Sequence, residues 1–195
     1  MRETLCLLLA LTLLPADAYP QAIGVRYGMG TIEGSYAGSG SDLLVGLQFD
    51  YSHTLTPHYA LEGGILATGS LPFATVLSEV ILAPIDPNPS ITIADFNSYY
   101  LGARADYELL PSWTAYLHGG LGYAKLTEYS PELQPSGDRH HYQKAHSYSG
   151  LHPYIGIGTE IRPFTSLGFT VDLRYDDLPH RYQGTTLFFG LSFYF

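Results

Sequence analysis

The 195-residue sequence contains one cysteine, Cys6, and few charged residues. A single thiol cannot form a disulfide within the chain, so the domain must be stable without one. Charged side chains make up only 14% of the residues, which is fewer than the surface of a soluble domain normally carries. The formal net charge of -9 argues against a nucleic acid as partner. After residue 18, no apolar run is long enough to cross a bilayer as a helix.

The first 18 residues have the pattern of a secretory signal peptide. A short segment with one basic residue, Arg2, precedes an almost wholly apolar run over residues 5–14. Residues 16–18 then read Ala-Asp-Ala, which matches an A-x-A cleavage site. We therefore expect export, cleavage after Ala18, and one mature domain of residues 19–195 without a thiol.

What the sequence does contain is alternation of apolar and polar residues, and it is strongest over residues 185–195. Every second residue there is apolar: Leu187, Phe189, Leu191, Phe193 and Phe195. A period of two indicates a β-strand. Such a strand promotes aggregation in a soluble protein, whereas a bilayer can cover its apolar face and barrel closure can pair its edges. The alternative is a soluble sandwich that ends on a core strand.

The same alternation recurs along the chain and predicts eight strands. They are expected near residues 22–33, 42–53, 59–67, 97–109, 113–129, 153–162, 167–176 and 185–195. Three connections are short and contain a proline, as tight turns do: Pro57, Pro111 and Pro163. The other four are longer, near residues 34–41, 70–96, 130–152 and 177–184. Each strand has about the 9–11 residues that cross a bilayer at a tilt. The pattern therefore predicts an all-β fold, an eight-stranded antiparallel up-and-down transmembrane β-barrel.

Alternation alone does not say which face of the strands is inside. A periplasmic lipocalin-like carrier would turn the apolar face inward. The reverse is favoured because the polar face is rich in glycine, as a narrow lumen requires, and carries charges of both signs. The apolar face also has aromatic residues near both strand ends, as membrane barrels have at their two interfaces. These predicted girdles comprise Tyr51, Tyr59, Tyr107 and Trp113 near the short turns, and Tyr99, Tyr123 and Tyr175 toward the long loops.

Charges inside a narrow barrel must pair, because removing one partner of a buried ion pair costs about 3–5 kcal/mol. We therefore predict an arginine–carboxylate network in the lumen, with His118 nearby. Its expected members are Arg26, Asp50, Glu62, Arg104, Asp106, Glu108, Glu160, Arg162, Asp172 and Arg174. A structural plug is favoured over a gated ion path, since an eight-stranded interior is just wide enough for side chains.

The end of the chain resembles the C-terminal assembly signal of bacterial outer-membrane β-barrels, in which apolar residues alternate before a terminal aromatic. Leu191, Phe193 and Phe195 carry this resemblance, which implies recognition by the barrel-assembly machinery. Eight strands, three tight turns and four long loops make the mature chain similar to small outer-membrane families, namely the OmpA-like transmembrane domain, opacity proteins, OmpX and OmpW. The resemblance implies a Gram-negative outer-membrane location, with short periplasmic turns and long loops at the cell surface. It also implies adhesion, envelope integrity or a narrow pore.

The long loops hold the remaining candidate chemistry. Residues 70–96 are unusually apolar and fit either a surface that binds a host molecule or lipid, or strands that extend above the membrane. The loop over residues 130–152, together with the last loop, carries histidines and cations: His140, His141, His146, His152, Arg139, Lys144 and Arg181. The cations could bind lipopolysaccharide phosphates, with a solvated loop as the alternative. The histidines lack zincin-like spacing, so neither a metal nor a cofactor is expected.

A catalytic triad could be drawn from His146, Ser147 or Ser149, and Asp176. These serines lack a strand-anchored H-x-S context, and no lipase motif is present. We therefore expect no catalytic residue and a non-enzymatic role, structural or at the cell surface. A narrow porin-like channel is the second hypothesis, and a lipid A-modifying enzyme is the third.

Overall fold

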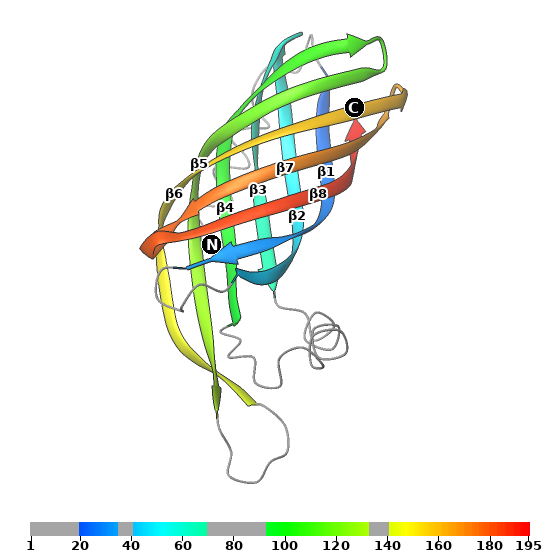
Figure 1. Cartoon of the computed structure of the whole chain (residues 1–195). Coiled ribbons are helices and arrows are strands. Elements are labelled where there is room, and N and C mark those ends of the chain that lie inside the picture. The colour runs from blue at the N-terminus through cyan, green and yellow to red at the C-terminus, as the bar shows by residue number, and fades with distance from the viewer. Residues whose placement is uncertain (1–19, 35–40, 70–92, 133–140) are drawn as a thin grey trace.

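The computed structural model describes residues 20–34, 41–69, 93–132 and 141–195. Each strand pairs antiparallel with the next, and the last pairs with the first to close a barrel (Figure 1). The strands are β1 (Gln21–Glu33), β2 (Ser41–Thr56), β3 (Tyr59–Gly69), β4 (Ile93–Leu110), β5 (Trp113–Glu132), β6 (His141–Phe164), β7 (Leu167–Leu178) and β8 (Tyr182–Tyr194). The predicted eight-stranded up-and-down barrel is confirmed. The expected signal peptide and most of the apolar loop lie outside the described residues.

Several strands extend further toward the long loops than the sequence predicted. β6 begins at His141 rather than near residue 153, and β4 begins at Ile93 rather than near residue 97. β5 and β6 pair as far as Glu132 and His141, so most of the predicted loop over residues 130–152 is a two-stranded extension (Figure 1). A short 3-10 helix, η1 (Pro179–Arg181), joins β7 to β8. No described helix is long and apolar enough to cross a membrane.

The apolar face of the strands points outward. On β8, Leu187, Phe189 and Phe193 are each more than a third exposed. Thr186 and Phe188, which point to the opposite face, are fully buried. The same alternation runs along β7, in which every second residue is buried. This orientation is opposite to that of a lipocalin-like carrier, because the outer wall is the apolar one.

The barrel closes where the two ends of the described chain meet. Phe193 pairs with Ile23 of β1 on one side and with Leu167 of β7 on the other. The backbone nitrogen of Phe195 donates to the oxygen of Gln21 at 3.0 Å, and the nitrogen of Gln21 donates back at 3.1 Å. The residues of the predicted assembly signal therefore form the seam between the last strand and the first.

Glycines on the inner wall make room for large side chains from neighbouring strands. A Cβ atom at Gly156 would overlap the imidazole of His118, and one at Gly28 would overlap the ring of Phe188. The narrow lumen can therefore hold whole arginine, histidine and aromatic side chains across its width.

Candidate functional site

The lumen is the candidate site, and its side chains change character along the barrel axis. Ion pairs occupy the end near the short turns and the middle, while apolar side chains fill the end toward the long loops. We call the groups the mouth cluster, the central cluster, the upper polar group and the apolar cap, and define each by its residues below.

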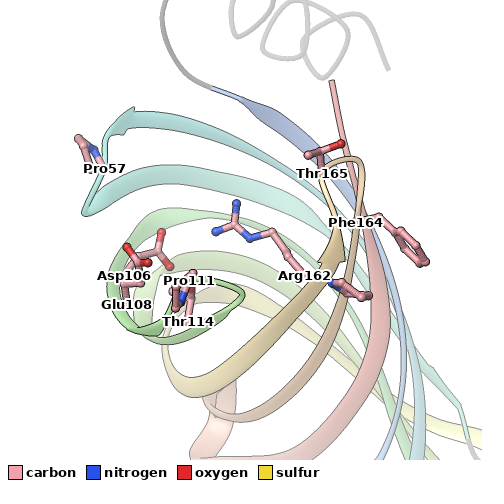
Figure 2. Close-up of a pocket in the computed structure, with 9 residues that line it drawn as sticks. Pro57, Asp106, Glu108, Pro111, Thr114, Arg162, Phe164 and Thr165 are labelled. Carbon is pink, nitrogen blue, oxygen red and sulfur yellow. The ribbon is translucent and has the colours of Figure 1, made fainter.

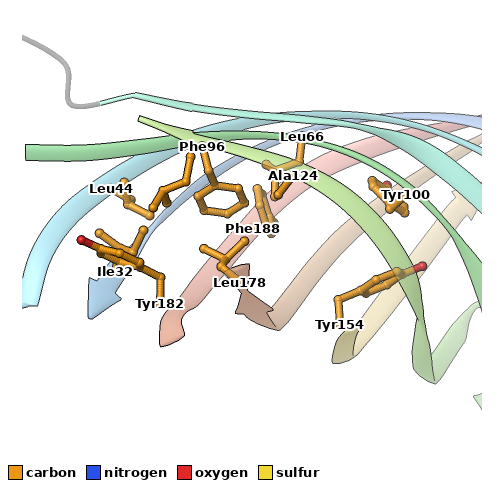
Figure 3. Packing of buried hydrophobic residues seen from close by; sticks show 11 residues of the cluster. Ile32, Leu44, Leu66, Phe96, Tyr100, Ala124, Tyr154, Leu178, Tyr182 and Phe188 are labelled. Atoms are coloured by element: carbon orange, nitrogen blue, oxygen red, sulfur yellow. The ribbon is translucent and has the colours of Figure 1, made fainter. Parts of the chain in front are cut away.

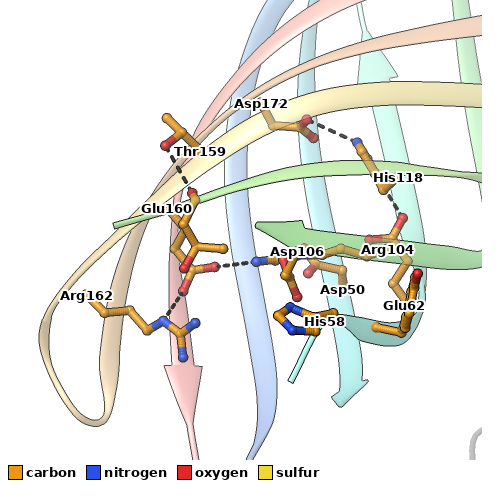
Figure 4. A network of polar contacts seen from close by, with 12 residues as sticks. Asp50, His58, Glu62, Arg104, Asp106, His118, Thr159, Glu160, Arg162 and Asp172 are labelled. Carbon is orange, nitrogen blue, oxygen red and sulfur yellow. Dashed lines mark hydrogen bonds and ion pairs between the residues drawn. The ribbon is translucent and has the colours of Figure 1, made fainter. Parts of the chain in front are cut away.

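The mouth cluster consists of Arg104, Asp106, Glu160 and Arg162, which Figure 4 labels, together with Tyr194. Arg104 Nε lies 2.6 Å from Asp106 Oδ1, and its Nη2 lies 3.2 Å from Glu160 Oε2. Glu160 also pairs with Arg162 Nε at 3.2 Å and accepts a hydrogen bond from the Tyr194 hydroxyl. One buried carboxylate thus joins two arginines that come from different strands.

The central cluster consists of Arg26, Asp50, Glu62, His118 and Asp172. Arg26 bridges two carboxylates, with Nη2 3.2 Å from Asp50 and Nη1 3.4 Å from Asp172. His118 bridges Asp172 to a third carboxylate, with Nε2 3.0 Å from Asp172 and Nδ1 2.7 Å from Glu62 (Figure 4). Both ring nitrogens can donate only when both carry a proton, so this geometry fits an imidazolium. His118 therefore completes the cluster as a second cation.

The upper polar group is centred on Arg174, whose guanidinium lies between two tyrosine rings. Its Cζ is 4.3 Å from the ring centre of Tyr100 and 4.1 Å from that of Tyr154. Its Nη2 donates to Asp176 Oδ1 at 2.8 Å. Tyr154 donates to Glu62 at 2.9 Å, which links this group to the central cluster.

Ser98, His152 and Asp176 belong to the same group and lie in the order of a catalytic triad. Ser98 Oγ is 2.7 Å from His152 Nε2, and His152 Nδ1 is 3.6 Å from Asp176 Oδ1. All three residues are fully buried, and Arg174 already neutralises Asp176. Because Ser98 and His152 have no solvent-accessible surface, we interpret this arrangement as a buried polar link.

The triad that the sequence allowed is not formed. His146 lies 3.5 Å from Glu128, and Ser147 donates to the backbone oxygen of Leu126. Asp176 instead contacts Arg174 and His152 inside the lumen.

The apolar cap fills the lumen toward the long loops (Figure 3). Its buried residues are Ile32, Leu44, Leu66, Phe96, Tyr100, Ala124, Leu126, Tyr154, Leu178, Tyr182 and Phe188. The lumen predicted from the sequence was polar and did not include this cap. The available signal was Leu44 and Phe188, which are large apolar residues on faces that are otherwise polar or small.

Two predictions about the network need correction. Glu108 is exposed at the mouth and pairs with no cation among the described residues, because it lies one step beyond Asp106 toward the turn. Asp176 was left out of the predicted network, yet it is fully buried and paired with Arg174. Arg162 belongs to the mouth cluster but is partly exposed.

The residues of the predicted girdles lie on the outer wall. Tyr59, Tyr99, Tyr107, Trp113 and Tyr123 are exposed there. Tyr51 and Tyr175 are half-buried, and the Tyr51 hydroxyl donates to Gln21 at 2.7 Å.

Beyond the long-loop end, the ring of Tyr148 contacts two histidine rings, nearly parallel to that of His146 and tilted by 39° from that of His180. The rings of His146 and Tyr148 are nearly parallel with centres 6.1 Å apart, and Tyr148 contacts His180 at 4.1 Å. His180 and Arg181 both have left-handed backbone conformations, with φ of 61° and 65°. Within the described part of the chain, no group of three or more His, Cys, Asp or Glu side chains could hold a metal ion. Arg139 and His140 lie outside the described residues, and the side chains of His141 and Lys144 are not described.

Comparison with known proteins finds similarity only in structure. No family model matches the chain, and no curated protein matches it. Among solved structures, neisserial surface protein A superposes with a TM-score of 0.64 at 11% identity, covering 91% of this chain and 100% of that one. Ail, the attachment invasion locus protein of Yersinia pestis, gives 0.59 at 16% identity, covering 90% and 98%. The N-terminal β-barrel domain of Pseudomonas aeruginosa OprF gives 0.51 at 12% identity, covering 90% and 97%. At these identities the similarity shows the fold.

Proposed function

We propose, from the premise that this chain has the fold of the small outer-membrane β-barrels, that it is a non-enzymatic integral outer-membrane protein. Its role is structural or in cell-surface interaction, through adhesion or envelope integrity. The chain is exported, loses residues 1–18 by cleavage after Ala18, and is inserted by the barrel-assembly machinery. The short turns face the periplasm and the long loops face the outside.

The observation that carries this proposal is the filled lumen. A channel needs a continuous water-filled path through the barrel. Leu66, Phe96 and Phe188 of the apolar cap are fully buried inside the lumen and obstruct such a path. Below the cap, the charges pair with one another, so they act as the core of the barrel. A barrel whose interior is occupied in this way acts through its outer wall and its exposed ends.

The surface partner is proposed to be anionic. Arg181, which follows His180 in the chain, is exposed, and Lys125 is exposed on β5. Guanidinium and ammonium groups bind phosphate and sulfate oxygens through charge-assisted hydrogen bonds. Ail has been solved in complex with the heparin analogue sucrose octasulfate, which makes a sulfated or phosphorylated polysaccharide such as lipopolysaccharide a reasonable class to test here.

Membrane fractionation with a heat-modifiability gel tests the location. We expect the protein in the outer-membrane fraction, with a mobility that changes on boiling. Deleting Phe195 removes the backbone bonds to Gln21 and should abolish the folded band. A soluble periplasmic protein with no heat-dependent shift would overturn the proposal.

Two further measurements separate the alternatives. In planar bilayers we expect no stepwise conductance from the wild-type barrel, and steady single-channel currents would favour the narrow channel. Lipid A composition should stay the same on deletion and on overexpression of the gene. A lost or added acyl chain would instead indicate a lipid A-modifying enzyme.

A further inference from the structure

A pocket of about 470 Å³ opens at the short-turn end of the barrel (Figure 2). This volume lies within the range of small-molecule sites, about 300–1,000 Å³. The pocket shares Asp106 and Arg162 with the mouth cluster and opens away from the buried part of that cluster, toward the short turns. Its lining residues are Pro57, Asp106, Glu108, Pro111, Thr114, Arg162, Pro163, Phe164 and Thr165.

One wall of the pocket is acidic. Asp106 and Glu108 lie two residues apart on β4, and both contribute to the lining. Asp106 uses Oδ1 to pair with Arg104, whereas Glu108 has no ion-pair or hydrogen-bond partner among the described residues. This wall therefore presents a carboxylate that is free to receive a cation.

The opposite wall presents a guanidinium from β6. Arg162 is anchored through Nε to Glu160 and stacks over Tyr194 at 4.7 Å. Its two terminal nitrogens have no partner among the described residues, and Figure 2 shows the guanidinium pointing across the mouth toward the acidic wall. A fork held in this way can bind a carboxylate through two parallel hydrogen bonds.

The backbone holds the two walls in place. The nitrogen of Asp106 donates to the oxygen of His58 at 2.8 Å, and the nitrogen of Arg162 donates to the oxygen of Ser112 at 2.7 Å. Each charged wall is thus tied to a neighbouring turn, and the prolines of these turns restrict the backbone further. The spacing between the positive and negative walls is therefore set before any ligand arrives.

We propose that this pocket binds a short zwitterionic peptide with free termini. The ammonium group pairs with Glu108 and with the remaining oxygen of Asp106, while the carboxylate is held by Arg162. The prolines that line the pocket supply apolar contact for side chains. The site does not depend on the membrane orientation of the barrel or on a surface role, so the two proposals can fail separately.

Titration calorimetry on the mature barrel folded in detergent micelles tests this proposal. The probe is trialanine, compared with N-acetyl-trialanine, which lacks the ammonium, and trialanine amide, which lacks the carboxylate. We expect trialanine to bind and each capped form to bind about tenfold more weakly or worse, since each has lost one charge-assisted contact. Dialanine and free alanine then show which length best spans the two walls.

The variants Glu108→Gln and Arg162→Gln should each weaken trialanine binding about tenfold. Glu108 is exposed and its side chain forms no ion pair with a described residue, so E108Q should fold normally even if R162Q disturbs the mouth cluster. The matched control is Glu33→Gln, which neutralises an exposed glutamate at the other end of the barrel and should leave binding unchanged. No heat of binding, equal binding of the capped peptides, or unchanged binding to E108Q would each overturn the proposal. The proposal would also be overturned if N-acetyl-trialanine bound weakly while trialanine amide bound as well as trialanine, because the pocket would then recognise only the cation.

Discussion

Replacing Asp172 with asparagine tests whether the paired charges act as the core of the barrel. Asp172 is fully buried and lies 3.4 Å from Arg26 Nη1 and 3.0 Å from His118 Nε2. Asparagine has nearly the same shape but no charge. After Asp172→Asn, Arg26 keeps only Asp50 as its ion-pair partner, and His118 keeps only Glu62.

The expected loss follows from these contacts. A hydrogen bond to a charged group contributes about 1.5–3 kcal/mol, and unpairing a buried ion costs about 3–5 kcal/mol. Because each cation keeps one carboxylate, we expect the lower part of that range, about 3 kcal/mol, in the free energy of unfolding.

Urea unfolding of the barrel in lipid vesicles measures this loss, with the mobility shift and the fluorescence of Trp113, the only tryptophan, as readouts. The control is Asp177→Asn, an exposed aspartate on the same strand, which should change stability by less than about 0.5 kcal/mol. The double variant Asp172→Asn/His118→Gln should lose less than the sum of its singles. A loss below about 1 kcal/mol for Asp172→Asn, or strict additivity, would refute the reasoning.

Three further predictions follow from the outer wall, the cap and the glycines. Leu117→Arg places a charge on the lipid face between the two predicted girdles and should destabilise the barrel in vesicles by about 2–4 kcal/mol, measured by urea unfolding. Phe188→Ala should cost about 3–5 kcal/mol in the same assay and should raise ion leak in planar bilayers, because it hollows the apolar cap. Gly156→Val should prevent the heat-modifiable band from forming, since its side chain would overlap His118, whereas Gly69→Val has open space and should fold normally.

The barrel itself could be predicted because a bilayer imposes a strong contrast between its two faces. Leu187, Phe189 and Phe193 alternate with smaller residues, and this pattern identifies a strand without any tertiary information. Past the bilayer the contrast is lost, so the start of β6 at His141 could not be located from its sequence. That strand is stabilised there by its backbone pairing with β5, which the alternation does not record.

Membership of the ion-pair network was harder to predict, since it depends on depth as well as on face. Asp106 and Glu108 share a face of β4, and Glu108 lies two residues closer to the short turn. Because of this difference in depth, Asp106 pairs with Arg104, whereas Glu108 lies in the open mouth of the barrel. Arg174 and Asp176 are likewise two residues apart on β7 and pair with each other, while the Arg174 guanidinium also lies over the rings of Tyr100 and Tyr154 from other strands.

The seam between Gln21 and Phe195 has a consequence for how the barrel forms in time. The contacts that complete the hydrogen-bonded circuit join the two ends of the described chain, so they have the largest possible sequence separation. The other seven strand pairs join consecutive strands, whereas this pair must close a loop of nearly the whole described chain, which has the larger entropy cost and is expected to form late. Until β8 arrives, the outer edge of β1 has no partner and can pair with another chain. Pairing of the last strand with β1 therefore decides whether a chain closes into a barrel or leaves edges that can associate with other chains.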